Sequence, residues 1–122
     1  MRKILSFIFV AILITGVIYA QDTRTVNLHW NSNPESNIAG YHMYRSENGG
    51  ETFYQISDQL IPHIGAGTES FLDIDAEVGE TYFYTCRAMN IYGLISDRSN
   101  IVSITIEATA PAPPTGLTVV IE

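Results

Sequence analysis

Polar and apolar side chains alternate with a period of two residues through most of the chain after residue 21. This is the period of a β-strand, whose successive side chains point to opposite faces, and it differs from the 3.6-residue period of a helix. No stretch after residue 21 has the capped amphipathic pattern of a helix of useful length. We expect strands at residues 25–31, 38–46, 52–57, 69–75, 81–90 and 100–107.

Turn-forming segments separate these strands. The sequence "ENGG" at residues 47–50 tolerates positive φ and predicts a hairpin. Residues 58–67 are irregular, residues 76–80 predict a turn, and residues 91–98 predict a loop. Short strands at even spacing with turns between them predict an all-β fold, an immunoglobulin-like β-sandwich that occupies residues 21–107.

The first twenty residues differ from the rest of the chain. Arg2 and Lys3 precede an unbroken apolar run that ends at Ala20, which is the layout of a secretory signal peptide with cleavage after that alanine. The run is at the lower limit of the about 20 residues that span a bilayer, and neither a basic cluster nor a lipidation cysteine follows it. We therefore expect a secreted protein, extracellular or at the cell surface, with a retained membrane anchor as the alternative.

Charge and cysteine content narrow the classes of partner. Removal of residues 1–20 leaves four arginines, no lysine and all 13 acidic residues, a formal charge of −9. Such a surface repels phosphate backbones, which argues against nucleic acid as a partner. The single cysteine, Cys86, cannot form an internal disulfide, and its place in an alternating strand predicts a small buried hydrophobe. Packing, or a partner, must therefore supply the stability of this small domain.

Several positions of the expected strands are in register with a known family. Trp30 stands at the place of a core tryptophan, and "GYHMYRS" at residues 40–46 matches a Gly-Tyr-x-Val-x-Arg strand. The stretch "VGETYFYTCRAMNIYGLIS" at residues 78–96 matches Pro-Gly-Thr-x-Tyr-x-x-x-Val-x-Ala-x-Asn-x-x-Gly-x-x-Ser. Over residues 25–106 the chain thus resembles a fibronectin type III domain. The resemblance implies a structural core that includes Trp30, Tyr41, Tyr82, Tyr84 and Cys86.

The resemblance also implies that the Tyr82 hydroxyl bonds back to the backbone at the preceding turn. Two departures from the family pattern matter. Ala76 stands where the family usually has leucine, and the first strand of the family, strand A, is missing before residues 25–31. A Pro-rich linker and a strand-A-like segment stand instead at the C-terminus, in residues 108–122. The apolar side chains that share one face of this tail are Leu117, Val119 and Ile121.

A strand edge without a partner recruits other strands. We therefore expect the tail to be donated to a neighbouring copy, a heterologous contact that generates a filament when it repeats. Insertion into the same domain is strained, because residues 108–114 reach about 22 Å and must pass along the whole sandwich. The alternative is that the sequence is a fragment of a tandem-repeat protein, in which the tail begins the next repeat.

Two groups of side chains invite a metal-site interpretation: the histidines His29, His42 and His63, and the alternating carboxylates Asp73, Asp75 and Glu77. The first two histidines point outward from opposite sheets and the third lies in an irregular segment, so we expect solvated histidines and no zinc site. The carboxylates lack the glycine and the terminal glutamate of a Ca²⁺ loop, and a polar turn is expected. We expect no metal, no cofactor and, without a nucleophile-elbow motif or an evident cleft, no enzymatic activity.

The outward faces of the strands at residues 38–46 and 81–90 carry a candidate binding face that consists of His42, Tyr44, Phe83 and Arg87. Aromatic rings beside arginine suit contacts to proteins or sugars, and ordinary cross-strand pairing is the alternative. The favoured hypothesis is a structural or adhesive module whose partners are copies of itself or other extracellular proteins. The second hypothesis is a spacer or carbohydrate-associated module of a larger extracellular enzyme, with polysaccharide as the partner.

Overall fold

A computed structural model describes residues 22–122, and the expected signal peptide lies outside them. The described part contains seven strands and no helix, and thus no helix that is long and apolar enough to cross a membrane. The strands are β1 (Thr23–Asn31), β2 (Ile38–Ser46), β3 (Tyr54–Gln55), β4 (Ile61–Pro62), β5 (Thr68–Glu77), β6 (Thr81–Asn90) and β7 (Val102–Thr105).

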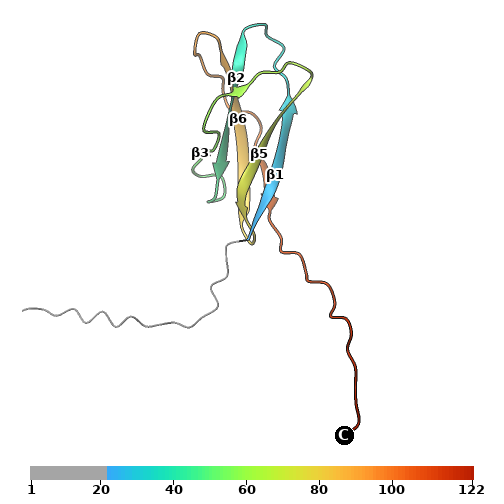
Figure 1. The fold of residues 1–122 in the computed structure, drawn as a ribbon. Helices are drawn as coiled ribbons and strands as arrows, with labels where there is room; N and C mark the ends of the chain where they lie inside the picture. The colour runs from blue at the N-terminus through green and yellow to red at the C-terminus, as the bar shows by residue number, and fades with distance from the viewer. Residues whose placement is uncertain (1–21) are drawn as a thin grey trace, which may run out of the picture.

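These strands form two antiparallel sheets (Figure 1). β1 pairs with β5 in a sheet of two strands, and the second sheet has five strands in the order β3-β2-β6-β7, with β4 also paired to β2. This arrangement confirms the expectation of an all-β protein and is consistent with a β-sandwich. Each sheet has one face toward the other, which is the reason for the alternating pattern of the sequence.

The strands agree closely with the expected segments where the alternation is long, and less well elsewhere. β2 and β6 begin and end at the expected residues, whereas the strand expected at residues 52–57 is reduced to the two residues of β3. β5 continues to Glu77, so the carboxylates of Asp73, Asp75 and Glu77 lie within a strand. The expectation of a polar turn at these residues was wrong. The chain turns at residues 78–80 instead, where Gly79 adopts a φ of 94°.

The space between the sheets is filled by a cluster of buried side chains: Val26, Leu28, Met43, Ala76, Tyr82, Tyr84, Cys86 and Ile106. Tyr41 is also buried, and Trp30 packs against the cluster while remaining partly exposed. The rings of Tyr41 and Trp30 meet edge to face, with centroids 5.2 Å apart. Trp30 is thus the point at which the core comes nearest to the surface on the β1 side.

Tyr82 ties the start of β6 to the end of β5. Its hydroxyl accepts a hydrogen bond of 2.9 Å from the backbone N–H of Glu77, and burial raises the pKa of this hydroxyl. Ala76, at the position where a leucine was expected from the resemblance, is fully buried beside it. Tyr82 is itself only 1% exposed, so the replacement of leucine by alanine does not open the core around this ring.

Serine hydroxyls replace backbone carbonyls along part of the β6 edge. The Ser96 hydroxyl accepts from the N–H of Ala88, and the Ser99 hydroxyl accepts from the N–H of Cys86, each at 2.9 Å. Ser99 also covers Thr85, which is buried although it lies on the outward face of the sheet. The segment that connects β6 to β7 is therefore fixed to β6 without being a strand.

The C-terminal residues 108–122 form no strand and extend away from the rest of the molecule (Figure 1). They leave from the end where β1 begins and β5 turns into β6. At this end the N–H of Val78 donates to the carbonyl of Asp22, and the N–H of Gly79 donates to that of Ile106. Leu117 and Ile121 are each 97% exposed and Val119 is 93% exposed.

The Tyr82 bond predicts a measurable loss of stability on removal of one oxygen atom. The Tyr82→Phe variant leaves the Glu77 N–H without its acceptor, and we expect the free energy of unfolding in urea to fall by about 1–3 kcal/mol. Tyr92→Phe is the control, because Tyr92 is exposed. Equal stability of the two variants would show that the hydroxyl bond does not stabilise the fold.

Candidate interaction site at the open flank

β1 has a partner on one side only. It pairs with β5 from Thr23 to Asn31, and within residues 22–122 no strand pairs with its other edge. The backbone N–H and C=O groups of an edge strand are a ready template for a further strand. The free edge of β1 is therefore a place where a chain in extended conformation can bind.

Across the gap from this edge, β7 exposes apolar side chains. Val102, Ile104 and Ile106 are two residues apart and share one side of the chain. Ile106 is only 5% exposed and belongs to the core, whereas Val102 is 47% and Ile104 44% exposed. The inward face of β7 is therefore covered at one end and uncovered along the rest.

Two connected hollows lie between β1 and the segment before β7. The first measures about 80 Å³ and the second about 320 Å³. Both are lined by Trp30, Cys86, Ser99 and Asn100. The first also contacts Leu28 and Val102, and the second continues to Asn33 and Ser96. We call the free edge of β1, these hollows and the exposed side of Val102 and Ile104 the open flank.

Two side chains that line the open flank, Trp30 and Cys86, carry groups whose surroundings would change if a peptide segment bound there. The Nε1 atom of Trp30 is buried and has no hydrogen-bond partner among residues 22–122, which leaves a donor in need of an acceptor beside the hollows that this side chain lines. Cys86 lies in the floor of both hollows, and burial raises the pKa of its thiol. A buried, neutral thiol acts as a small hydrophobe.

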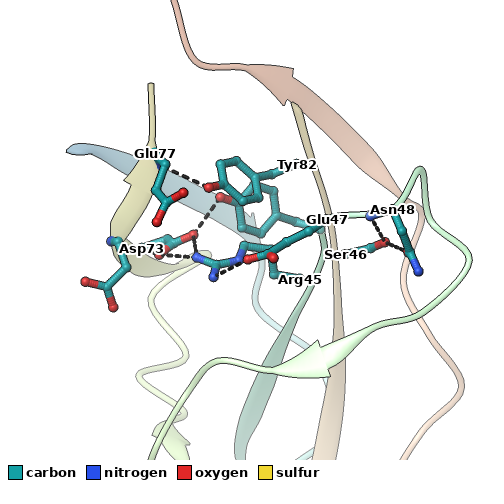
Figure 2. Close-up of polar contacts among 9 residues, drawn as sticks. Arg45, Ser46, Glu47, Asn48, Asp73, Glu77 and Tyr82 are labelled. Carbon is teal, nitrogen blue, oxygen red and sulfur yellow. Dashed lines mark hydrogen bonds and ion pairs between the residues drawn. The ribbon is translucent and has the colours of Figure 1, made fainter. Parts of the chain in front are cut away.

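The two sheets are joined on the β5 side by a buried ion pair (Figure 2). Arg45 of β2 donates to both carboxylate oxygens of Asp73 at 3.0 and 2.8 Å, and its guanidinium lies 4.8 Å from the ring centroid of Tyr82. The Tyr84 hydroxyl donates to Asp73 at 2.7 Å. Burial and this bond to the carboxylate raise the pKa of Tyr84. Burial alone would lower the pKa of Arg45, but Asp73 raises it.

Sequence reasoning missed this pair because it interpreted Asp73, Asp75 and Glu77 together as a polar turn, although residue 73 lies within the strand expected at residues 69–75. The signal that could have found it was the position of Asp73 among alternating strand residues, with its neighbours Leu72 and Ile74 pointing the other way. Asp73 is almost fully buried, and all its contacts are hydrogen-bond donors of this chain. These bonds give the carboxylate a structural role, and Asp73 also lines a hollow of about 710 Å³ beside β5.

A second buried carboxylate, Glu69, organises the loops near the end of β1. It accepts from the N–H of Ile64 at 2.6 Å and from the Ser32 hydroxyl at 3.0 Å. His63 Nδ1 lies 3.9 Å from Glu69 and shares a hydrogen bond of 2.9 Å with the Tyr41 hydroxyl. The expectation of a solvated His63 was therefore wrong.

The other two histidines lie where the strands were expected to place them. His29 is on β1 and His42 on β2, which belong to different sheets. Among the residues that the structure describes, no three His, Cys, Asp or Glu side chains are grouped so that they could hold a metal ion.

The structure brings the candidate binding face together on β2 and β6. His42 pairs directly with Arg87, and Phe83 pairs with Ser46. The Arg87 guanidinium lies 5.8 Å from the ring centroid of Tyr44, and nearby Arg98 lies 4.9 Å from that of Phe53. Two aromatic faces on this side are thus already in contact with cations of the same chain.

No protein-family model matches this chain, and no curated protein matches it either.

Glu69 predicts a specific acid sensitivity. Burial acts to raise the pKa of Glu69, but the hydrogen bonds from Ile64, Gly65 and Ser32 outweigh it and hold the pKa below its usual value. A depressed pKa contributes stability above the unfolded value of about 4.3, and this contribution is lost as the pH falls through the folded value.

We therefore expect the unfolding free energy of Glu69→Gln, followed in urea between pH 6 and about pH 3, to depend less on pH than that of the parent. Glu51→Gln, at an exposed position, is the matched control and keeps the slope of the parent. If the unfolding free energy of Glu69→Gln changed with pH as steeply as that of the parent, the conclusion that the pKa of Glu69 is lowered in the folded state would be contradicted.

Proposed function

We propose that this chain is a secreted, non-enzymatic structural or adhesive module of the fibronectin type III kind, and that its copies assemble head to tail. In this proposal residues 115–121 of one copy fill the open flank of the next. The observation that carries it is the pairing of two unsatisfied surfaces in one chain. One is a free strand edge beside half-exposed Val102 and Ile104, and the other is an apolar, extended tail that is almost fully exposed.

The tail fits the flank in length and in pattern. Leu117, Val119 and Ile121 alternate over five residues, the same spacing as the inward residues of β1. Antiparallel entry sets these three tail residues opposite Trp30, Leu28 and Val26 in turn. Burial of each would contribute roughly 1.5–3 kcal/mol before the entropy of ordering the tail is subtracted.

The direction of the strands favours a neighbour over the same chain. An antiparallel partner of β1 must begin at the end where β1 stops, but the tail leaves from the end where β1 starts. The linker at residues 108–114 reaches about 22 Å, whereas the nine residues of β1 span about 30 Å. A second copy stacked beneath the first receives the tail without reversal, and the repeated contact is heterologous.

The free edge of β5 is a poorer acceptor. The hollow of about 710 Å³ beside it is lined by seven apolar side chains and Gln59, but also by four charged ones, Arg45, Asp58, Asp73 and Asp75. An apolar strand placed there would remove water from the carboxylates of Asp58 and Asp75, which have no ion-pair partner among residues 22–122, and this is unfavourable. The open flank offers Leu28, Val102 and a tryptophan N–H instead.

The non-enzymatic part of the proposal is supported by the use of the buried acids. Asp73 and Glu69 are both held by hydrogen-bond donors of the chain itself, as structural carboxylates are. Secretion is supported by the sequence of residues 1–20.

The second candidate is a spacer or carbohydrate-associated module of a larger extracellular enzyme, in which the tail begins a following repeat. The face formed by Tyr44, Phe83, His42 and Arg87 favours it, because these side chains do lie on one surface. In that case polysaccharide would bind the single domain, and Tyr44→Ala would abolish binding.

Two adjacent valines provide a matched test of tail donation. Val119 lies on the face expected to enter the flank, and Val120 lies on the opposite face. We expect the chain from residue 21 to form species whose mass grows with concentration in light scattering. Val119→Asp and truncation after Glu107 should both give monomers, whereas Val120→Asp should still assemble. Monomers from the unchanged chain, or equal assembly of the two aspartate variants, would contradict donation.

The thiol of Cys86 reports occupancy of the flank directly. We expect a synthetic peptide of residues 108–122 to slow the reaction of Cys86 with a thiol reagent, in the chain truncated after Glu107, by about tenfold, because the thiolate must be accessible to react. The same peptide with Val119→Asp should not protect the thiol. Equal labelling rates with both peptides would place the tail elsewhere.

A further inference from the structure

The loop between β6 and β7 exposes an unusual number of large apolar side chains for its length. Four side chains within five residues are between 51% and 77% exposed: Ile91, Tyr92, Leu94 and Ile95. We call this group the loop tip. It stands at the end of the molecule opposite to the one from which the tail leaves.

The loop tip has a fixed shape. The Asn90 side-chain oxygen accepts from the N–H groups of Tyr92 and Leu94, both at 3.0 Å. The N–H of Asn90 donates to the carbonyl of Leu94. The N–H of Gly93, a residue with a φ of 80°, donates to the carbonyl of Asn90. Because the backbone is already held, a partner that binds the tip would order little of it.

The loop tip is continuous with the open flank. A hollow of about 240 Å³ is lined by Leu94 and Ile95 and also by Asn33 and Ser96. The same Asn33 and Ser96 line the larger hollow of the open flank. An extended chain that enters the flank from this end therefore passes the loop tip first.

The segment that would pass there is the Pro-rich linker. With Leu117 opposite Trp30, Pro114 lies about 9 Å and Pro111 about 19 Å further toward the loop end, at about 3.1 Å per residue in polyproline II conformation. Proline-rich segments in this conformation bind surfaces lined by aromatic rings, and Tyr92 supplies such a ring.

The distribution of charge also favours a contact between the Pro-rich linker of one copy and the loop tip of another. The expected secreted form has a formal charge of −9, so two copies repel each other over most of their surfaces. Residues 108–121 carry no charged side chain, and residues 90–96 carry none either. Contact between the neutral linker and the four loop-tip side chains therefore adds no like-charge repulsion of its own, and Glu35 is the acidic residue that lines the adjoining hollow.

We propose that the loop tip of one copy binds residues 111–114 of the copy that donates its tail, as a second contact beside the inserted strand. This inference rests on the proposed function. The loop tip would make the entry of the tail selective for a strand preceded by prolines.

Peptide binding separates the two proposals. The acceptor is the full chain with Val119→Asp, whose own tail cannot fill a flank, and the probes are fluorescent peptides of residues 108–122 and 115–122. We expect the longer peptide to bind about tenfold more tightly in anisotropy titrations, a factor within reach of one additional apolar contact. Replacement of Tyr92 and Leu94 by serine in the acceptor should remove this advantage and leave the shorter peptide unaffected.

Tyr54→Ser, at another exposed tyrosine, on β3, is the control and should keep the advantage of the longer peptide. Equal affinity of the two peptides, or an advantage that persists without Tyr92 and Leu94, would overturn the role of the loop tip while strand donation stands. Failure of both peptides to bind would overturn strand donation, and the loop tip proposal with it. Unfolding midpoints of the acceptors confirm that the exposed substitutions leave the fold intact.

Discussion

The fold is governed by an imbalance in strand pairing: β1 is hydrogen-bonded along one edge and open along the other within residues 22–122. A two-stranded sheet covers less of a five-stranded one than a full layer would, and the uncovered part lies over β7. Val102 and Ile104 are half exposed for this reason, although they share a face with buried Ile106. Trp30 lines the hollows in this gap, and its buried N–H has no acceptor among residues 22–122. The proposed assembly is the simplest way to satisfy backbone, apolar surface and indole together.

The β5 side shows how the chain stabilises a sheet edge without a partner. Arg45, Asp73 and Tyr84 satisfy one another there, and the hollow beside them contains the carboxylates of Asp58 and Asp75, which disfavour an apolar strand. The two flanks of the small sheet are thus chemically different, and the difference gives the proposed contact its direction. A heterologous contact with one donor end and one acceptor end leads to a linear assembly instead of a closed pair.

Alternation predicted the all-β fold and the bounds of β2 and β6, because long strands with one buried face have a strong period of two. It did not predict the role of Asp73 and Glu69, since a buried carboxylate in a strand has the same sequence pattern as an exposed one. Nor did it predict the contact of His63 with Tyr41, which joins residues 22 positions apart. For the loop tip the sequence predicted only a loop at residues 91–98, because loop propensity says nothing about which side chains the loop exposes.

The central claim is that the free edge of β1 is filled by the tail of another copy. Hydrogen exchange of the full chain at low and high concentration tests it most directly, because it reports donor and acceptor strands separately. The account predicts that amides in residues 24–30 and in residues 117–121 become protected together as the concentration rises. Oligomers in which residues 117–121 still exchange as an unprotected chain would contradict it.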